Sequence, residues 1–419
     1  MPETLDMTLD RETRVGRPLA RNSNFVLLVG GQFISQMGDR LAMVAFPWIV
    51  YRTTGSALST GVVLALFTLP YVLFGVVAGG VLDRIDKRGV MVAADIARGG
   101  LVLVVPFVAE RSTSGVFVLA FLTACATVFF DPGLMALLPD IVPNRELLRA
   151  NSVLAASAHI TEIVGYSAAG FIVFYLATRT AFRVDAATFG ISAVTLLAMT
   201  LKRSPEAGGS GGATGAAGDR RSSFWREIRE GITYLRRHAG LRANTALTVA
   251  AAAGVGAFYP LTFLLAVEQF HGTRAFGFME AAVAVGYLSG SVVMGALAKR
   301  VPKGLAITVG LMVMGACCAL PWAVHTLPLV IADFVVLGCA DAAVLISIDT
   351  YVQTIVPEKL RGRVWGARFT LTQGVFALGV LVAGALATTV GLGPLFGLCG
   401  LIVFVPAVIG LFLPVVRSV

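Results

Sequence analysis

The segment Gly79–Gly–Val–Leu–Asp83–Arg84–Ile–Asp–Lys–Arg88 directly follows a long apolar stretch of the chain. A related segment, Gly295–Ala–Leu–Ala–Lys–Arg300, stands in the same place after another apolar stretch, 216 positions later. The tripeptide Ile141–Val–Pro143 recurs as Ile355–Val–Pro357, at an offset of 214. Two independent matches at nearly the same offset indicate that the chain consists of two repeated halves.

The composition places these halves in a membrane. Of the 419 residues 57% are hydrophobic and only 14% are charged, and the mean hydropathy is +0.82. A soluble globular protein carries about 25% charged residues, and a membrane helix needs roughly 20 apolar ones. The sequence therefore predicts an all-α integral membrane fold with twelve transmembrane helices in two parallel six-helix halves. The apolar runs lie at about residues 25–51, 58–82, 89–110, 115–138, 151–176, 181–201, 243–267, 275–298, 304–324, 328–351, 364–390 and 394–414.

A polar stretch separates the halves. Residues Ser204–Gly218 are rich in Gly, Ala and Ser, which is typical of a flexible linker. Phe224–His238 carries apolar residues at helical spacing with interleaved arginines, which favours an amphipathic helix on the membrane surface; a solvated linker helix is the alternative. The predicted parts are a terminal segment at 1–23, a six-helix half at 24–203, a linker at 204–238 and a second half at 239–416.

The net charge of +9 is explained by topology, because 26 of the 33 basic residues fall in segments on one predicted side of the membrane. Basic residues gather on the cytoplasmic side, so we expect both termini in the cytoplasm and no role for nucleic acid. Residues Met1–Arg21 lack an apolar stretch, and a cleaved signal is not expected.

The segment Gly79–Arg88 resembles the loop between helices 2 and 3 of the major facilitator superfamily, Gly-x-x-x-Asp-Arg-x-Gly-Arg-Arg, with Asp86 in place of Gly. Further motifs resemble the bacterial drug:proton antiporter-3 branch, which includes macrolide, tetracycline and siderophore exporters and, more distantly, lysophospholipid flippases. These motifs are Ser35–Arg40, Phe46–Trp48, Gly55–Ser56, Asp95–Arg98, Arg149–Asn151, Asp185–Phe189 and Pro357 with Arg361–Arg363. The resemblance implies the major facilitator fold and a bacterial cytoplasmic (inner) membrane location.

One motif departs from that pattern. Antiporters of the superfamily often carry Gly-Pro-x-x-Gly-Gly in helix 5, where this chain has Gly165–Tyr–Ser–Ala–Ala–Gly170. Tyr166 replaces Pro and Ala169 replaces one Gly, so the usual link to antiport is weakened.

Ionisable residues inside the apolar runs are functional candidates, because a charge at the bilayer centre costs at least about 2.5–3.5 kcal/mol. Asp39 lies roughly 20 Å into its helix and Glu162 roughly 15 Å into its own, at 1.5 Å per residue. Gln32 and Gln36 share the helix face of Asp39. By resemblance, Asp39, Asp131 and Asp341 would line a central cavity. The proton-coupling and substrate-cavity candidates are Asp39, Glu162, Asp341, Asp131, Gln36, Gln32 and Arg40.

A structural role is the alternative for these carboxylates. Asp39 or Glu162 would then neutralise Arg40 or Arg98 in a permanent ion pair. Adjacent residues of a helix point about 100° apart, so Arg40 needs a partner other than Asp39.

The repeated loop is the candidate cytoplasmic gate, made of Gly79, Asp83, Arg84, Arg88 and Asp140. By resemblance, Asp83 would meet the positive N-terminal end of helix 11, and an arginine of the loop would pair with Asp140. Topology-setting charge alone explains the arginines but not Asp83.

The sequence thus favours a secondary transporter that exports small amphipathic or hydrophobic compounds in exchange for protons. Lipid or lysophospholipid translocation, siderophore export and transport without proton coupling stay open. An integral-membrane enzyme is disfavoured, because the four histidines are scattered and neither a P-loop nor HExxH occurs. We expect no cofactor, no metal site and no obligate protein partner; the partners are a small molecule, protons and the bilayer. Aromatic residues fit either a cargo site or helix packing: Phe46, Phe67, Tyr71, Phe258 and Phe263.

Overall fold

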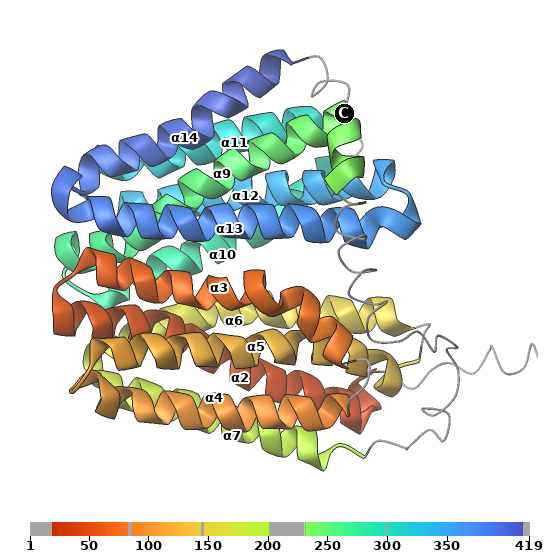
Figure 1. Ribbon diagram of the computed structural model, residues 1–419, viewed down its shortest axis with the longest axis vertical. Coiled ribbons are helices and arrows are strands. Elements are labelled where there is room, and N and C mark those ends of the chain that lie inside the picture. The colour runs from red at the N-terminus through yellow and green to blue at the C-terminus, as the bar shows by residue number, and fades with distance from the viewer. Residues whose placement is uncertain are drawn as a thin grey trace, which may run out of the picture.

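The computed structural model describes residues 19–82, 86–143, 146–200, 230, 232–297 and 300–413. Within these residues the regular structure is helical, without strands, and the long helices run side by side (Figure 1). The first six are α2 (Ser23–Thr54), α3 (Ala57–Leu82), α4 (Lys87–Ala109), α5 (Thr113–Ile141), α6 (Leu147–Tyr175) and α7 (Thr178–Ala198). The next six are α9 (Ala239–Leu264), α10 (Thr273–Leu297), α11 (Lys303–Ala319), α12 (Leu327–Ile355), α13 (Glu358–Val390) and α14 (Leu392–Phe412). Short helical turns are η1 (Leu19–Arg21), η3 (Leu265–Gln269, a π-helix) and η4 (Leu320–Trp322).

The twelve expected spans are present as helices, and their bounds lie close to the apolar runs. Eleven helices of the described residues are long and apolar enough to cross a membrane. The remaining one, α2, has 32 residues, which exceeds the length needed to span. Its polar residues Gln32, Gln36, Asp39 and Arg40 lower its hydropathy. These are the residues that the sequence marked as candidates.

The helices form two bundles. In the first, α2 packs on α6 and α7, α4 packs on α5 and α7, and α3 packs on α5. In the second, α10 and α11 pack on α12, α9 packs on α13, and α14 packs on α9 and α11. The bundles meet mainly through α6 with α10 and α3 with α13 (Figure 1).

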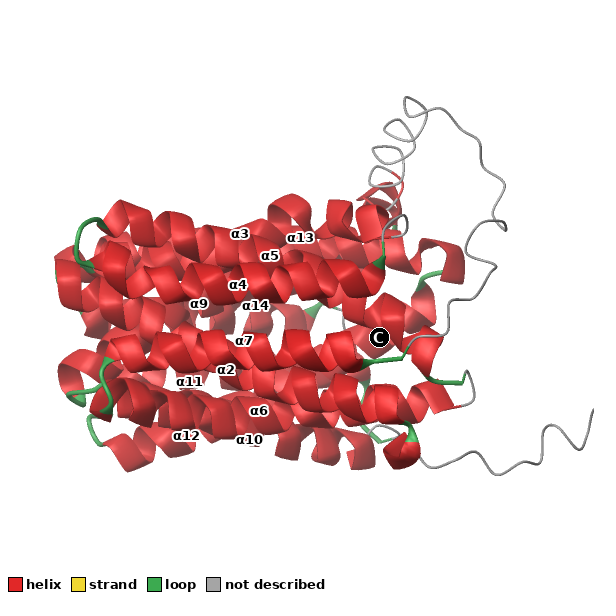
Figure 2. Ribbon diagram, turned by 90° about the horizontal axis from the view of Figure 1, so that it is seen from below, coloured by secondary structure: helices red, strands yellow, loops and turns green. Residues whose placement is uncertain are grey.

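The bundle ends define two faces of the molecule. We call the end where α2 begins and α14 ends the termini face, and the opposite end the loop face (Figure 2). Asn22 fixes the start of α2 at the termini face, because its side chain accepts from the Phe25 amide and donates to the carbonyl of Ile141 at 2.7 Å. The start of α2 is thereby tied to the end of α5.

Three hydrogen bonds that join the bundles lie toward the loop face. They run from the Tyr51 hydroxyl to Glu268 (2.9 Å), from the Thr273 hydroxyl to the Gly170 carbonyl (3.2 Å) and from Arg274 to the Tyr175 hydroxyl (2.7 Å). The Arg274 guanidinium also lies 4.2 Å from the centre of the Phe174 ring. The bundles are therefore closed against each other at the loop face.

The two glycines kept in the helix 5 motif both permit close approach. A Cβ atom at Gly165 would lie 2.9 Å from Cγ of Arg40, and one at Gly170 would lie 2.8 Å from the carbonyl oxygen of Thr273. Helix α6 therefore contacts α2 with one glycine and α10 with the other, as close packing in membranes requires.

The predicted linker lies largely outside the described residues. Of the proposed amphipathic helix Phe224–His238, residues 232–237 are helical, and the Tyr234 hydroxyl donates to the carbonyl of Ile355 at 3.1 Å. This short segment is thus held against the termini-face end of α12.

Candidate functional site

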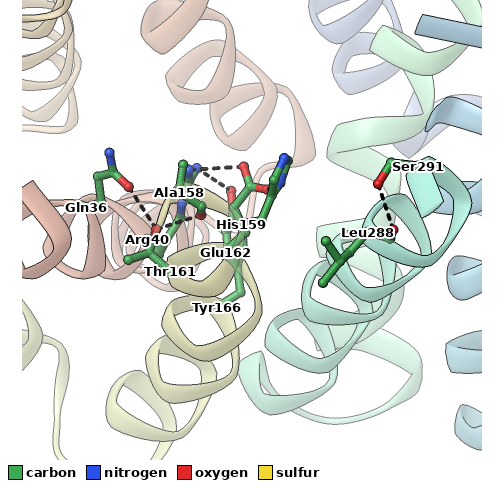
Figure 3. Close-up of polar contacts among 9 residues, drawn as sticks. All are labelled: Gln36, Arg40, Ala158, His159, Thr161, Glu162, Tyr166, Leu288 and Ser291. Atoms are coloured by element: carbon green, nitrogen blue, oxygen red, sulfur yellow. Dashed lines mark hydrogen bonds and ion pairs between the residues drawn. The ribbon is translucent and has the colours of Figure 1, made fainter. Parts of the chain in front are cut away.

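Arg40 extends from α2 to α6, where it meets Glu162 and Tyr166 (Figure 3). Its Nη2 atom lies 3.2 Å from Oε1 of Glu162, and its Nη1 atom lies 3.5 Å from the Tyr166 hydroxyl. Nδ1 of His159 lies 3.2 Å from the other carboxylate oxygen. Arg40 therefore has its partner on another helix, as the sequence predicted.

Glu162 also faces the second bundle. The His159 ring, one turn before it, lies 5.2 Å from the ring of Tyr287 in α10. Glu280 of α10 is an electrostatic neighbour of Arg40 and Glu162, and Asp341 of α12 is an electrostatic neighbour of Glu162. Carboxyl groups from both bundles therefore gather around the α6–α10 contact.

Arg98 is the centre of a second charged group, inside the first bundle. Only 1% of this residue is exposed. Its guanidinium lies between the rings of Phe130 and Phe189, at 4.5 Å and 4.3 Å from their centres. It donates a hydrogen bond to Asp95, three residues earlier on α4, and lies 3.6 Å from Oδ1 of Asp39. Asp39 is thus paired with Arg98, in line with the structural alternative drawn from the sequence.

Asp185 of α7 completes this group. The residue is fully buried, and neither carboxyl oxygen has a hydrogen-bond partner among the described residues. A Cβ atom at Gly38 would lie 2.5 Å from Oδ1 of Asp185, so the carboxyl group lies directly against the backbone of α2. Asp39 and Arg98 are its charged neighbours.

The remaining polar candidates of the first bundle contact neighbouring helices. Asp131 accepts a hydrogen bond from the Tyr71 hydroxyl at 3.1 Å. Gln36 accepts one from Thr161 of α6 at 2.9 Å (Figure 3), and Gln32 is buried. Of the predicted stripe, Gln36 and Asp39 therefore meet helices of their own bundle, α6 and α4.

A cavity of about 410 Å³ lies in the second bundle, between α9, α11, α12 and α13. Its wall includes the carboxyl groups of Asp341 and Asp349 and the guanidinium of Arg368. The rings of Trp365 and Phe369 belong to the same wall. An apolar lining with a few charged groups is typical of small-molecule sites, whose volumes run from about 300 to 1,000 Å³.

Arg368 is held in this wall by its neighbours on α9. The residue is 7% exposed, and its Nη2 atom donates to Oδ1 of Asn244 at 2.8 Å and lies 3.4 Å from the Thr248 hydroxyl. Asp349 is its charged neighbour across the cavity. Of the predicted cavity residues, Asp341 alone belongs to this wall.

The aromatic residues singled out in the sequence serve packing rather than this cavity. Phe46, Phe258 and Phe263 are buried in the core, and Phe46 meets Phe67 edge to face with ring centres 5.2 Å apart. None of the five aromatic residues lines this cavity, and the Tyr71 hydroxyl instead donates to Asp131.

The gate candidates are only partly described. Asp83 and Arg84 lie outside the described residues, and Gly79 lies in the last turns of α3. Asp140 pairs with Lys87, whose Nζ atom is 2.9 Å away.

The expected arginine partner of Asp140 is not Arg88. The Arg88 guanidinium instead donates to carbonyl oxygens at the end of α7, those of Met199 (2.9 Å) and Leu197. A basic residue at the C-terminal end of a helix satisfies its free carbonyl groups and complements the helix dipole.

Sequence reasoning missed the role of Asp95, Arg98 and Asp185 as one charged group. Asp95 and Arg98 stand three residues apart inside an apolar run, which is ion-pair spacing on a helix and was available as a signal. The cavity pair Asp349 and Arg368 was missed because both stand close to the ends of the predicted apolar runs 328–351 and 364–390, where a charge is ordinary. Among the described residues, no group of three or more His, Cys, Asp or Glu side chains could hold a metal ion.

Known proteins resemble the whole chain. The multidrug efflux pump Tap of Mycobacterium tuberculosis is 27% identical over 95% of this chain and 96% of its own length. Macrolide efflux protein A of Streptococcus pyogenes is 25% identical over 92% of this chain and 94% of its own length.

Solved structures show the same fold at low sequence identity. The nucleoside transporter NupG superposes with a TM-score of 0.74 at 14% identity, covering 93% of this chain and 98% of its own. A bacterial homolog of the human lysosomal transporter Spinster, in an inward-facing and unoccupied conformation, gives 0.69 at 13% identity and covers 96% of each chain.

The sequence model of the Major Facilitator Superfamily matches residues 28–304 and 245–418, which together include nearly all of the chain. Its helices form the two six-helix bundles that the repeated segments predicted. The chain is a multi-pass membrane protein that belongs to the Major Facilitator Superfamily.

Proposed function

We propose that the chain exports small amphipathic or hydrophobic compounds from the cytoplasm in exchange for protons. The observation that carries this proposal is the arrangement at the α6–α10 contact. There Glu162 of one bundle and Asp341 of the other are electrostatic neighbours, and Asp341 also belongs to the wall of the 410 Å³ cavity. A compound in the cavity would thus lie near carboxyl groups at mid-membrane depth.

The cavity wall supports an amphipathic cargo. Aromatic rings offer apolar contact area, and Asp341, Asp349 and Arg368 offer charge-assisted hydrogen bonds. The relatives named multidrug and macrolide efflux proteins match this chain over nearly its full length, which supports drug-like compounds as cargo.

Proton coupling is supported by the depth of the carboxyl groups. Removal of a carboxylate from water disfavours its charged form, so a change in hydration between two states of a transporter would bind or release a proton. Glu162 is in contact with both Arg40 and His159, so a change in its charge would act on groups of α2 and α6 together.

Charge and geometry support export from the cytoplasm as the direction of transport. Among the described residues, the basic side chains of Lys87, Arg88, Arg242, Lys303 and Arg361 belong to helix ends at the termini face, which we assign to the cytoplasm of a bacterial cell by the positive-inside rule. Three hydrogen bonds between the bundles lie at the loop face, and the cavity is lined by Val352 and Trp365, near the termini-face ends of α12 and α13. This state would take up cargo from the cytoplasm.

The experiment is transport by purified protein in lipid vesicles with an imposed pH gradient. A labelled macrolide is the first probe and a labelled lysophospholipid is the second. We expect the gradient to drive accumulation of the macrolide and a proton ionophore to abolish it. Gradient-driven movement of the lysophospholipid alone would favour lipid translocation. Macrolide transport that is unaffected by both the pH gradient and the ionophore would contradict proton exchange.

A further inference from the structure

The Arg98 group contains more negative than positive charge. Three carboxyl groups, those of Asp39, Asp95 and Asp185, surround one guanidinium inside the first bundle. Asp131, hydrogen-bonded to Tyr71, is a further electrostatic neighbour of Asp39 and Arg98. If all the carboxyl groups were ionised, one positive charge would face several negative charges at mid-membrane depth, which is energetically prohibitive.

Asp95 accounts for the charge of Arg98. Both residues are buried, and the guanidinium donates a hydrogen bond to the Asp95 carboxylate from the next turn of the same helix. The rings of Phe130 and Phe189 cover the two faces of the guanidinium. This pair is fixed by packing on both sides, so it serves as a constant counter-charge.

Asp185 is left without a counter-charge of its own. It is 0% exposed, and neither oxygen finds a hydrogen-bond donor among the described residues. An ionised carboxylate in such a place costs several kcal/mol, whereas the neutral acid costs far less. Asp185 therefore holds a proton in this state.

Asp39 is the most accessible of the three carboxyl groups around Arg98. Its side chain is 32% exposed, whereas Asp95 and Asp185 are fully buried. Gly38, directly before it, touches the Asp185 carboxyl group, and the absence of a side chain there lets α2 and α7 approach. Arg40, directly after Asp39, forms its ion pair with Glu162 and is a second, electrostatic neighbour of Asp39 beside Arg98.

We propose that Asp39 and Asp185 form a two-carboxyl proton-binding site of the first bundle, with the Arg98–Asp95 pair as its fixed counter-charge. The two carboxyl groups share one exchangeable proton. When Asp39 is ionised it is paired with Arg98, and the proton is on Asp185. When the O–H bond of Asp185 breaks, its proton passes to a carboxylate oxygen of Asp39, and from there to water. The site rests on the proposed proton exchange and assigns it to α2 and α7, apart from the cavity in the second bundle.

The first test needs no cargo. Infrared difference spectra of the purified protein in lipid, recorded as the pH is changed, report the C=O stretch of protonated carboxyl groups. We expect one such band to vanish in Asp185→Asn and to shift in Asp185→Glu. The control is Glu110→Gln, which alters an exposed carboxylate paired with Arg179 and should leave the band in place. If Asp185→Asn does not fold, the band shift in Asp185→Glu alone tests the assignment. Spectra in which no band responds to either change at Asp185 would overturn the site.

The second test separates the site from the proposed function. In vesicles, we expect Asp39→Asn and Asp185→Asn each to lower the gradient-driven accumulation of macrolide by at least about tenfold. Both should keep exchange of labelled for unlabelled macrolide, which needs no net proton movement. Wild-type accumulation in Asp185→Asn would overturn the site and leave proton exchange intact. If the wild-type protein itself ignores the gradient, the proposed function fails, and the infrared bands still report whether Asp185 holds a proton.

Discussion

At the residue scale, the two arginines at mid-membrane depth differ in what surrounds them. Arg98 is enclosed by two aromatic rings and a hydrogen-bonded carboxylate, so its charge is fixed in place. The Arg40 side chain is 22% exposed and reaches across to α6, next to the contact with the second bundle. A change in the charge of Glu162 therefore reaches the boundary between the bundles, whereas a change at Asp95 stays inside one of them.

The Arg40 pair provides a stability prediction. Glu162→Gln removes the negative charge that Arg40 and His159 share, so the partly buried guanidinium loses its counter-ion. We expect the free energy of unfolding to fall by about 1–3 kcal/mol. Thermal unfolding of the purified protein in detergent measures this change.

The matched control is Glu110→Gln. Glu110 also pairs with an arginine, Arg179, but its side chain is 60% exposed and Arg179 is 54% exposed. Exposed ion pairs contribute only about 0–1 kcal/mol, so this variant should unfold close to the wild-type temperature. Equal losses in the two variants would contradict the role given to the Arg40 pair.

Single residues also show which features of the candidate site could be predicted from the sequence. Asp39 and Glu162 were identified because a charge inside an apolar run is costly, which is a local property. Arg40 and Arg98 were offered as their partners, but the sequence left open which carboxylate pairs with which arginine, because that depends on which helices are neighbours. The sequence left the aromatic residues open between cargo site and packing for the same reason: only the packed helices separate buried Phe46 and Phe258 from Trp365 and Phe369 in the cavity wall.

At the element scale, helix α6 carries much of the contact between the bundles. A Cβ atom at Gly277 of α10 would lie 2.4 Å from the carbonyl oxygen of Tyr166, so the two helices touch through their backbones. Gly277→Ala should push them apart and cost about 1–3 kcal/mol in unfolding free energy. Thermal unfolding measures the cost.

Gly295→Ala is the control on the same helix. No atom lies within 4 Å of the position where its Cβ would stand. In a helix, replacing Gly by Ala stabilises by up to about 1 kcal/mol where space allows. The free energy of unfolding of this variant should therefore equal or exceed that of the wild type. A loss of stability in Gly295→Ala as large as that in Gly277→Ala would argue against the close backbone contact.

The hydrogen bond between Tyr51 and Glu268 at the loop face provides a second prediction at this scale. The π-helical turn Leu265–Gln269 at the end of α9 presents Glu268 to the Tyr51 hydroxyl of α2. Tyr51→Phe removes this bond, worth about 1 kcal/mol, and should raise the population open at the loop face by about fivefold. Distances between spin labels at Ser56 and at Val390, an exposed residue at the loop-face end of α13, report the shift. Tyr234→Phe, which removes a bond to Ile355 inside the second bundle, should leave them unchanged.

Helix existence was the most predictable part of the structure. Long apolar runs fix where a chain crosses a membrane, because every backbone polar group must be satisfied inside the helix. The run at 25–51 corresponds to α2 (Ser23–Thr54) although polar residues lower its hydropathy, and the run at 394–414 corresponds to α14. The π-helical turn at Leu265–Gln269, which carries Glu268, was not predicted from the sequence.

At the scale of the whole molecule, the two bundles form a transporter in one of its states. Three hydrogen bonds between them lie at the loop face, while the cavity lies in the part of the second bundle nearer the termini face. Closure at one face with a cavity toward the other is what alternating access requires of a state that loads on one side. The two-fold repeat explains why closure requires only the bundles to rock against each other.

Locking the loop face tests this arrangement directly. Helices α3 and α13 meet at Gly61 and Gly384, where a Cβ atom at Gly61 would lie 3.2 Å from Cα of Gly384. Two cysteines at these positions are close enough for a disulfide, which needs Cα atoms about 4.4–6.8 Å apart. In Gly61→Cys/Gly384→Cys we expect oxidation to abolish transport, because the bundles could no longer open at the loop face. A reductant should restore transport.

Macrolide binding from the termini face should survive oxidation, since the cavity would stay in its present form. The single variant Gly61→Cys should transport equally well under both conditions. Full transport by the oxidised, cross-linked protein would mean that cargo leaves without separation of α3 from α13.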